Sequence, residues 1–153
     1  MRVNLVDIVY GLESQSEDHL FYVNRHSGEI IHVVHKFLHM AKSDAVQKQM
    51  ENWEAKEFRL AKKILRDSND YILLPQMPAI QKVMIRFTET VEDIERQKAL
   101  LETIQASATF KPFRSLLKMY ELLDDWYGFR EEIYIGIARD FCEKHELNYQ
   151  EIE

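Results

Sequence analysis

The 153-residue chain is poor in glycine, proline and cysteine. Its four glycines and three prolines are too few for the repeated tight turns of a sandwich or barrel, so the composition favours helices. Its one cysteine, Cys142, cannot form an internal disulfide. A chain with a single thiol is typical of the reducing cytoplasm.

Long apolar runs are also missing. The N-terminal stretch is interrupted at Asn4 and Asp7, so it lacks the continuous apolar core of a signal peptide. No run approaches the roughly 20 apolar residues that a membrane-spanning helix needs. We therefore expect a cytoplasmic protein that does not enter the membrane.

Positive charge is in the minority. The chain has 20 lysines and arginines against 26 aspartates and glutamates, which gives a formal net charge of −6. This balance argues against non-specific binding to nucleic acid or to an anionic membrane, although it leaves room for a local basic patch. The length suits one domain with a substantial core, and we predict a single domain over residues 1–153.

Hydrophobic periodicity predicts a small sheet in the N-terminal half. Apolar residues at helical spacing predict a short helix over 4–14. Residues 20–23 and 29–34 are rich in β-branched and aromatic side chains and predict a hairpin, whose loop contains Gly28 and needs a positive φ there. The short apolar run 71–75 ends in proline and suits an edge strand that joins this hairpin.

A long helix is expected between the hairpin and that edge strand. Ser43 or Asp44 can cap it, and it would run to about Arg66. Charged residues are expected on its outer face. Its apolar stripe is expected to be Met50, Trp53, Leu60 and Ile64, widened by Phe58, Ala61 and Leu65.

The C-terminal half is predicted to be helical. The expected helices cover about 80–91, 93–105, 110–122 and 125–145. Ile94 is expected on the apolar stripe of the second helix. Phe113 and Trp126 are on the stripes of the last two, which have a short connection and should pack together. The tail after Leu147 is expected to fray. The predicted fold class is α+β, with a small antiparallel N-terminal sheet packed on a mainly helical body.

Aromatic and cationic side chains alternate at helical spacing in the segment 110–130, FKPFRSLLKMYELLDDWYGFR. Lys111, Arg114 and Lys118 recur at intervals of three and four and therefore share a helix face. Such a face can bind a phosphate or an acidic partner. The density of Trp, Tyr and Arg is typical of protein interfaces, but it also suits a solvated face over a packed helical core.

The candidate binding residues follow from this segment. They are Lys111, Arg114, Lys118, Trp126, Tyr127 and Arg130. Their aromatic members can also stack on nucleic-acid bases.

Five of the six histidines lie in one window, from His19 to His39. On a helix, His35 and His39 would share a face, with His32 just before them, which is a common geometry for a first-row metal. Glu29 is the only carboxylate among the last four of these histidines, and the motif H-E-x-x-H is absent. The pattern predicts surface or half-buried histidines and no cofactor. In the alternative interpretation, a metal site, the candidate ligands are His32, His35 and His39.

Several segments together resemble Uncharacterised Protein Family number 0158, a mostly bacterial group. They are HSGEIIHV (26–33), YILLP (71–75), IQKVMIRF (80–87), ATFKPFRSLL (108–117) and WYGFREE (126–132). The resemblance extends from about Val6 to Leu147. The family has no established activity, so the resemblance implies a fold and a bacterial origin rather than a reaction.

Three functional hypotheses remain open. The first is a non-enzymatic protein-binding or regulatory module that meets a partner, or a second copy of itself, through the basic-aromatic helices. The second is a small metal-assisted enzyme that uses the histidine window at 19–39. The third is a nucleic-acid-binding protein, against which the acidic balance argues.

Overall fold

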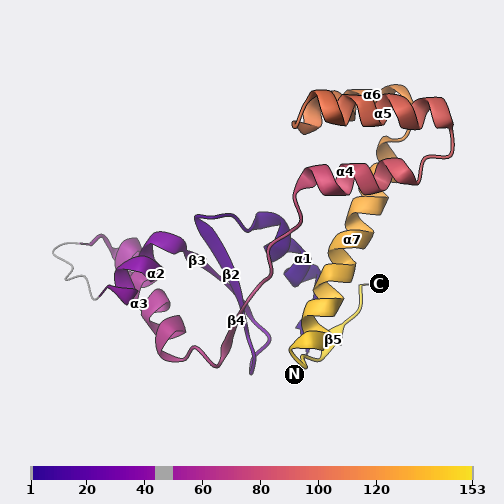
Figure 1. Ribbon diagram of the computed structural model, residues 1–153. Coiled ribbons are helices and arrows are strands. Elements are labelled where there is room, and N and C mark those ends of the chain that lie inside the picture. The colour runs from indigo at the N-terminus through magenta and orange to yellow at the C-terminus, as the bar shows by residue number, and fades with distance from the viewer. Residues whose placement is uncertain (1, 44–49, 153) are drawn as a thin grey trace. The chain divides into compact units, whose positions relative to one another are not determined.

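The computed structural model describes residues 2–43 and 50–152. Within these residues the chain forms seven α-helices, a three-stranded antiparallel sheet and a two-stranded parallel sheet, which confirms the α+β class (Figure 1). The chain divides into two compact units. The first unit comprises Met1–Gln76 and Ile137–Glu153, and the second unit comprises Met77–Gly136.

The larger sheet of the first unit is built around β2 (His19–Asn24). This strand pairs antiparallel with β3 (Ile30–Val34) on one side and with β4 (Tyr71–Leu73) on the other. The predicted hairpin is confirmed: Gly28 has a φ of 75°, and Asn24 Oδ1 accepts two backbone N–H bonds within the loop. β4 is an edge strand, as its short apolar run predicts.

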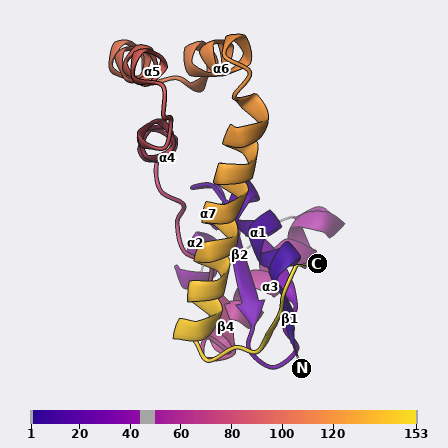
Figure 2. The same cartoon turned by 90° about the vertical axis from the view of Figure 1, so that its right-hand side faces the viewer.

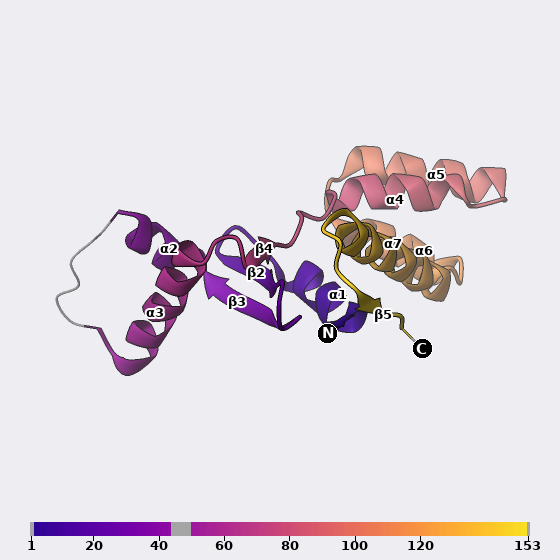
Figure 3. The same ribbon diagram turned by 90° about the horizontal axis from the view of Figure 1, so that it is seen from below.

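Two helices cover one face of this sheet (Figures 1 and 3). They are α2 (His35–Lys42) and α3 (Asn52–Arg66), and side chains of one parity, such as Tyr22 and Val33, pack toward them. The buried members of this cluster are Val33, Phe37, Leu38, Phe58, Ala61, Ile64 and Tyr71.

The opposite face is covered by α1 (Leu5–Ser14), which confirms the first predicted helix. The ring of Phe21 lies edge-on to that of Tyr10, with centroids 6.4 Å apart. Gly11 permits this close approach, because a Cβ there would lie 2.7 Å from Leu74 Cδ1. A larger residue at position 11 would therefore require the Leu74 side chain to shift.

The predicted start of the long helix at Ser43 or Asp44 is wrong, whereas its predicted end at Arg66 is confirmed. Ser43 is the C-terminal cap of α2, and Asp44 lies outside the described residues. α3 begins at Asn52 because Glu51 and Glu54 form a reciprocal capping box, which satisfies backbone N–H groups that a helix start leaves free.

The expected apolar stripe of this helix is confirmed at its buried residues but not at its start. Met50 precedes α3, and the side chain of Trp53 is 56% exposed. The indole Nε1–H donates to Glu51 Oε2 at 3.0 Å, so Trp53 lies over the cap instead of in the core. The buried face of α3 is Phe58, Ala61 and Ile64.

The C-terminal tail does not fray at Leu147. β5 (Tyr149–Gln150) pairs in parallel with β1 (Val3–Asn4), and the yellow tail follows the N-terminal strand in Figure 2. Arg139 and Glu151 form an ion pair, with 2.6 Å between Nη2 and Oε2. The pairing brings together the two ends of the sequence, which local periodicity cannot reveal.

The second unit consists of four helical segments, close to those predicted. They are α4 (Ile80–Glu89), α5 (Ile94–Ala106), α6 (Phe110–Met119) and the part of α7 (Leu123–Lys144) up to Gly136. Asp93 starts α5 by accepting hydrogen bonds from two backbone N–H groups of the first turn.

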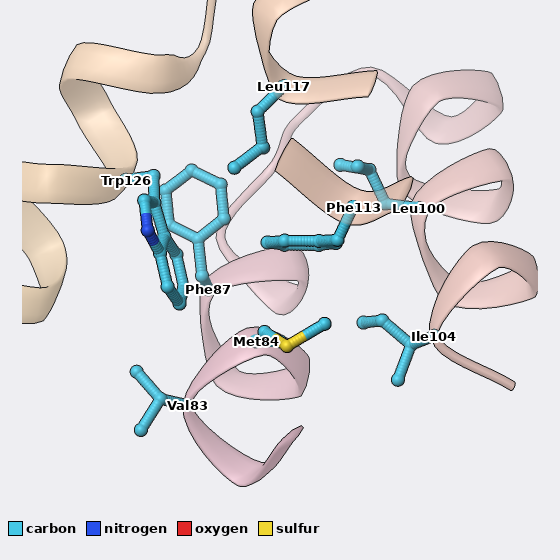
Figure 4. Packing of buried hydrophobic residues seen from close by; sticks show 8 residues of the cluster. All are labelled: Val83, Met84, Phe87, Leu100, Ile104, Phe113, Leu117 and Trp126. Carbon is cyan, nitrogen blue, oxygen red and sulfur yellow. The ribbon is translucent and has the colours of Figure 1, made fainter. Parts of the chain in front are cut away.

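The core of the second unit is apolar and rich in rings (Figure 4). Its buried members are Val83, Met84, Phe87, Leu100, Ile104, Phe113, Leu117 and Trp126. Phe113 and Trp126 face each other with ring centroids 5.4 Å apart, which confirms the predicted contact. The expectation for Ile94 is wrong: it is the first residue of α5 and is 76% exposed, while Leu100 takes the core position.

Truncation of either buried ring should strongly destabilise the protein. We expect Trp126→Ala and Phe113→Ala each to lower the free energy of unfolding by about 3–5 kcal/mol, because both the transfer energy and the packing around a cavity are lost. Arg114 is exposed, so Arg114→Glu should change it by under about 1 kcal/mol. Urea denaturation followed by circular dichroism measures all three, and an unaltered midpoint for Trp126→Ala would contradict the core assignment.

Candidate functional site

The basic-aromatic residues lie on α6 and α7 of the second unit, but they do not all have the same role. Trp126 is only 1% exposed, so it belongs to the core and cannot itself stack on an external ligand. Its indole stacks on Phe110, with centroids 5.5 Å apart and planes inclined by 28°. Tyr127, the next residue, is 43% exposed.

A small pocket of about 180 Å³ opens beside this stack. We call it the aromatic pocket; its lining residues are Ile80, Phe110, Trp126, Tyr127 and Arg130. The structure therefore brings together the three candidates of α7. The other two, Ile80 and Phe110, are not among the candidate binding residues predicted from the sequence. Ile80 is the first residue of α4 and is 39% exposed.

Arg130 is held in place at this pocket. Its Nε–H donates to the hydroxyl of Tyr134 at 3.1 Å, and its guanidinium lies over the Tyr134 ring at 4.9 Å. These two contacts fix the orientation of the Arg130 guanidinium through its Nε–H and one of its faces. Among the described residues no acceptor lies on its two terminal nitrogens, which remain available for a carboxylate.

Lys111, Arg114 and Lys118 form what we call the basic stripe of α6. All three are exposed, and in the part of the chain that the structure describes none of them has a carboxylate within ion-pair distance. Arg114 follows Phe110 by four residues and lies about 40° around the helix from it. The basic stripe therefore flanks the side of α6 that contributes to the aromatic pocket.

The histidine window does not converge on one centre. His35 and His39 are exposed on α2, and His26 Nε2 lies 2.8 Å from Asp70 Oδ1. Over residues 2–43 and 50–152, no three histidine, cysteine or acidic side chains are grouped so that they could hold a metal ion.

One pair of histidines does meet in the first unit. His19 Nδ1 and His32 Nε2 are 2.8 Å apart and share a hydrogen bond, and their rings stack with centroids 4.9 Å apart. The Phe21 ring also lies 4.9 Å from that of His32. A bond of this kind needs at least one neutral ring, because two imidazolium ions have only donors.

The single thiol of the chain, Cys142, is not placed to act as a nucleophile. Cys142 is fully buried on α7, and burial raises the pKa of its thiol to about 11. The thiol is therefore protonated at neutral pH and serves as a small apolar side chain.

Over the described residues, no helix has the length and apolar character to cross a membrane.

The comparison of the sequence with known families gives one result. The chain matches the Uncharacterised protein family (UPF0158) over residues 3–151 and belongs to that family, as the resemblance of its motifs predicts. No curated protein and no solved structure matches it.

Protonation of His32 is expected to destabilise the fold. Burial, and then the neighbouring His19, lower the pKa of His32 below its ordinary value of 6.5, while Glu57 has a smaller opposite effect. The unfolded chain takes up this proton more readily, so this contribution is constant above about pH 6.5 and stability falls as the pH drops below it.

The variant His32→Gln should therefore lose less stability than the wild type between about pH 7.5 and about pH 5.5. Urea denaturation at both pH values, followed by circular dichroism, measures the difference. An equal loss in the two proteins would contradict this role for His32.

Proposed function

We propose that the second unit is a non-enzymatic docking module that binds an acidic segment of a protein partner. The segment would place one apolar or aromatic side chain in the aromatic pocket, with a carboxylate on Arg130. Further acidic residues would lie along the basic stripe. The observation that carries the proposal is the juxtaposition of this pocket with a preoriented arginine and three exposed cations without ion-pair partners.

The size of the pocket favours a side chain over a metabolite. Small-molecule sites usually enclose about 300–1,000 Å³, whereas this pocket has about 180 Å³. Pockets that hold a single anchor, lined by Trp, Tyr and Arg, are typical of the energetic centre of protein interfaces. Ile80 and Tyr127 are partly exposed at its rim, so a partner side chain would remove apolar surface from water there.

The charges favour an acidic partner. The chain as a whole carries a net charge of −6, so an acidic partner is repelled by most of its surface. The basic stripe is the local exception and would orient the encounter.

Burial of Trp126 weighs against nucleic acid, because one of the two candidate rings for stacking on a base is enclosed in the core. Three cations also give only a modest electrostatic grip on a polyanion.

The setting of this interaction is also part of the proposal. We place it in the cytoplasm of a bacterium, because family membership suggests the source and the single thiol suits a reducing compartment. The partner is either another protein or a second copy of this chain. The packing of the small sheet on the helical body stays a prediction, and the proposed docking function does not depend on it.

Charge reversal on this surface should weaken capture of the partner without unfolding the protein. We expect Arg114→Glu and Arg130→Glu each to reduce the recovery of co-purifying protein at least about tenfold. Each change removes an attraction to a carboxylate of the partner and replaces it with a repulsion. Quantitative mass spectrometry of affinity-purified complexes from the source cell measures this recovery.

The matched control is Lys63→Glu, which reverses an exposed charge on α3 of the first unit and should leave recovery unchanged. Sedimentation of the purified chain separates self-association from capture of another protein. A partner profile that is the same in all three variants would refute the proposed surface.

A further inference from the structure

The first unit contains a separate groove beside β4. Its volume is about 480 Å³, within the range of true binding sites. Leu73, Leu74 and Pro75 contribute to one wall, and Ile137 and Phe141 of α7 contribute to another. Leu73 is 44% exposed, although it belongs to a strand of the sheet. The groove shares no residue with the aromatic pocket.

The register of β4 shows which of its backbone groups are unused. Leu74 N–H donates to Phe21 O, and Arg25 N–H donates to Asp70 O, so the backbone groups used at Leu74 and Asp70 face β2. In an antiparallel ladder the bonded pairs alternate with non-bonded ones. The intervening residues of β4, Tyr71 and Leu73, therefore direct their N–H and C=O groups away from β2.

Among the residues that the structure describes, no further strand pairs with β4 on that side. Within the described residues, no backbone hydrogen bond satisfies the outward groups of Tyr71 and Leu73. These two residues are about 7 Å apart along the strand, which is the repeat of an extended peptide chain. Such an edge is a template for an additional strand.

The rim of the groove carries charges of both signs. Asp140 and Lys144 are one turn apart on α7 and both line the groove, yet they do not form an ion pair. Side chains at this spacing commonly pair with each other. Each is therefore free to meet an opposite charge on a ligand.

We propose that this groove binds an extended peptide segment of another protein, which adds as a short fourth strand to the free edge of β4. Apolar side chains of the segment lie against Leu73, Ile137 and Phe141, and its polar side chains meet Asp140 and Lys144. The peptide is favoured over a small molecule because its repeating backbone matches the outward groups of Tyr71 and Leu73. Pro75 limits the added strand to a few residues, because it offers no N–H beyond the edge.

The test starts from a random dodecapeptide library displayed on phage and selected on the full chain. A selected peptide is synthesised with a fluorophore, and its Kd is measured by anisotropy. The informative variant is Leu73→Pro, because it removes an outward N–H without removing a bond to β2, and proline is tolerated at such edge positions. Leu73→Ala removes the side chain but keeps this N–H.

We expect Leu73→Pro to weaken the peptide at least tenfold more than Leu73→Ala does. Ile137→Glu, which places a charge in the apolar wall, should also weaken it at least tenfold and does not depend on the strand tolerating proline. Binding should slow hydrogen exchange of the Tyr71 and Leu73 amides. Arg130→Glu should leave the Kd unchanged, so failure of this site and failure of the aromatic pocket are distinguishable.

Four outcomes would overturn the proposal. They are a library that yields no binder, a peptide unaffected by both Leu73→Pro and Ile137→Glu, a peptide sensitive to Arg130→Glu alone, and a dimer of this chain that Leu73→Pro dissociates. The last outcome would assign the edge of β4 to a second copy.

Discussion

The ring of Trp126 is the contact on which the second unit depends most. It is almost fully buried and lies edge-on to Phe87 and Phe113, with centroids 5.5 and 5.4 Å apart, while it stacks on Phe110. These rings come from α4, α6 and α7, so one side chain joins three helices. The same indole is a wall of the aromatic pocket. One wall of the pocket is therefore part of the packed core, and a preformed wall needs little ordering when a partner binds.

β2 has a comparable role in the first unit. As the central strand it is bonded on both sides, and its alternating side chains reach α2 and α3 on one face and α1 on the other. Its antiparallel partner β4 then becomes an edge by topology alone. The register that fixes Leu74 on Phe21 also fixes which amides of β4 point outward. The free edge is thus a consequence of the same pairing that stabilises the sheet.

Much of the fold is predictable from local pattern. Apolar spacing predicts α4 and α7, alternation with a glycine loop predicts the hairpin, and a proline-closed run predicts β4. The start of α3 is harder to predict from the sequence. An acidic capping box at Glu51 begins this helix within an apolar stripe that periodicity alone would extend toward the N-terminus. The β1–β5 pairing involves two residues from each end of the sequence, and no local signal identifies such partners.

The candidate site was predictable only in part, for a different reason. The exposed cations of α6 follow from helical spacing, since charged side chains avoid the core. The pocket does not, because Ile80 and Phe110 are on apolar stripes whose burial depends on how neighbouring helices meet. Trp126 illustrates the same point: composition marks it as a possible contact residue, while packing places it in the wall behind the contact.

The two proposed sites use α7 in the same way. Its earlier part supplies Tyr127 and Arg130 to the aromatic pocket, and its later part supplies Ile137 and Phe141 to the groove. In each case the helix forms a wall with fixed side-chain spacing, and a shorter segment of another element completes the site. Because the apolar contacts of both sites are set by the folded core, specificity has to come from the groups at the rim. At the aromatic pocket the charged lining residue is Arg130, whereas the groove presents both Asp140 and Lys144. Partners of the two sites should therefore differ in charge pattern more than in apolar content.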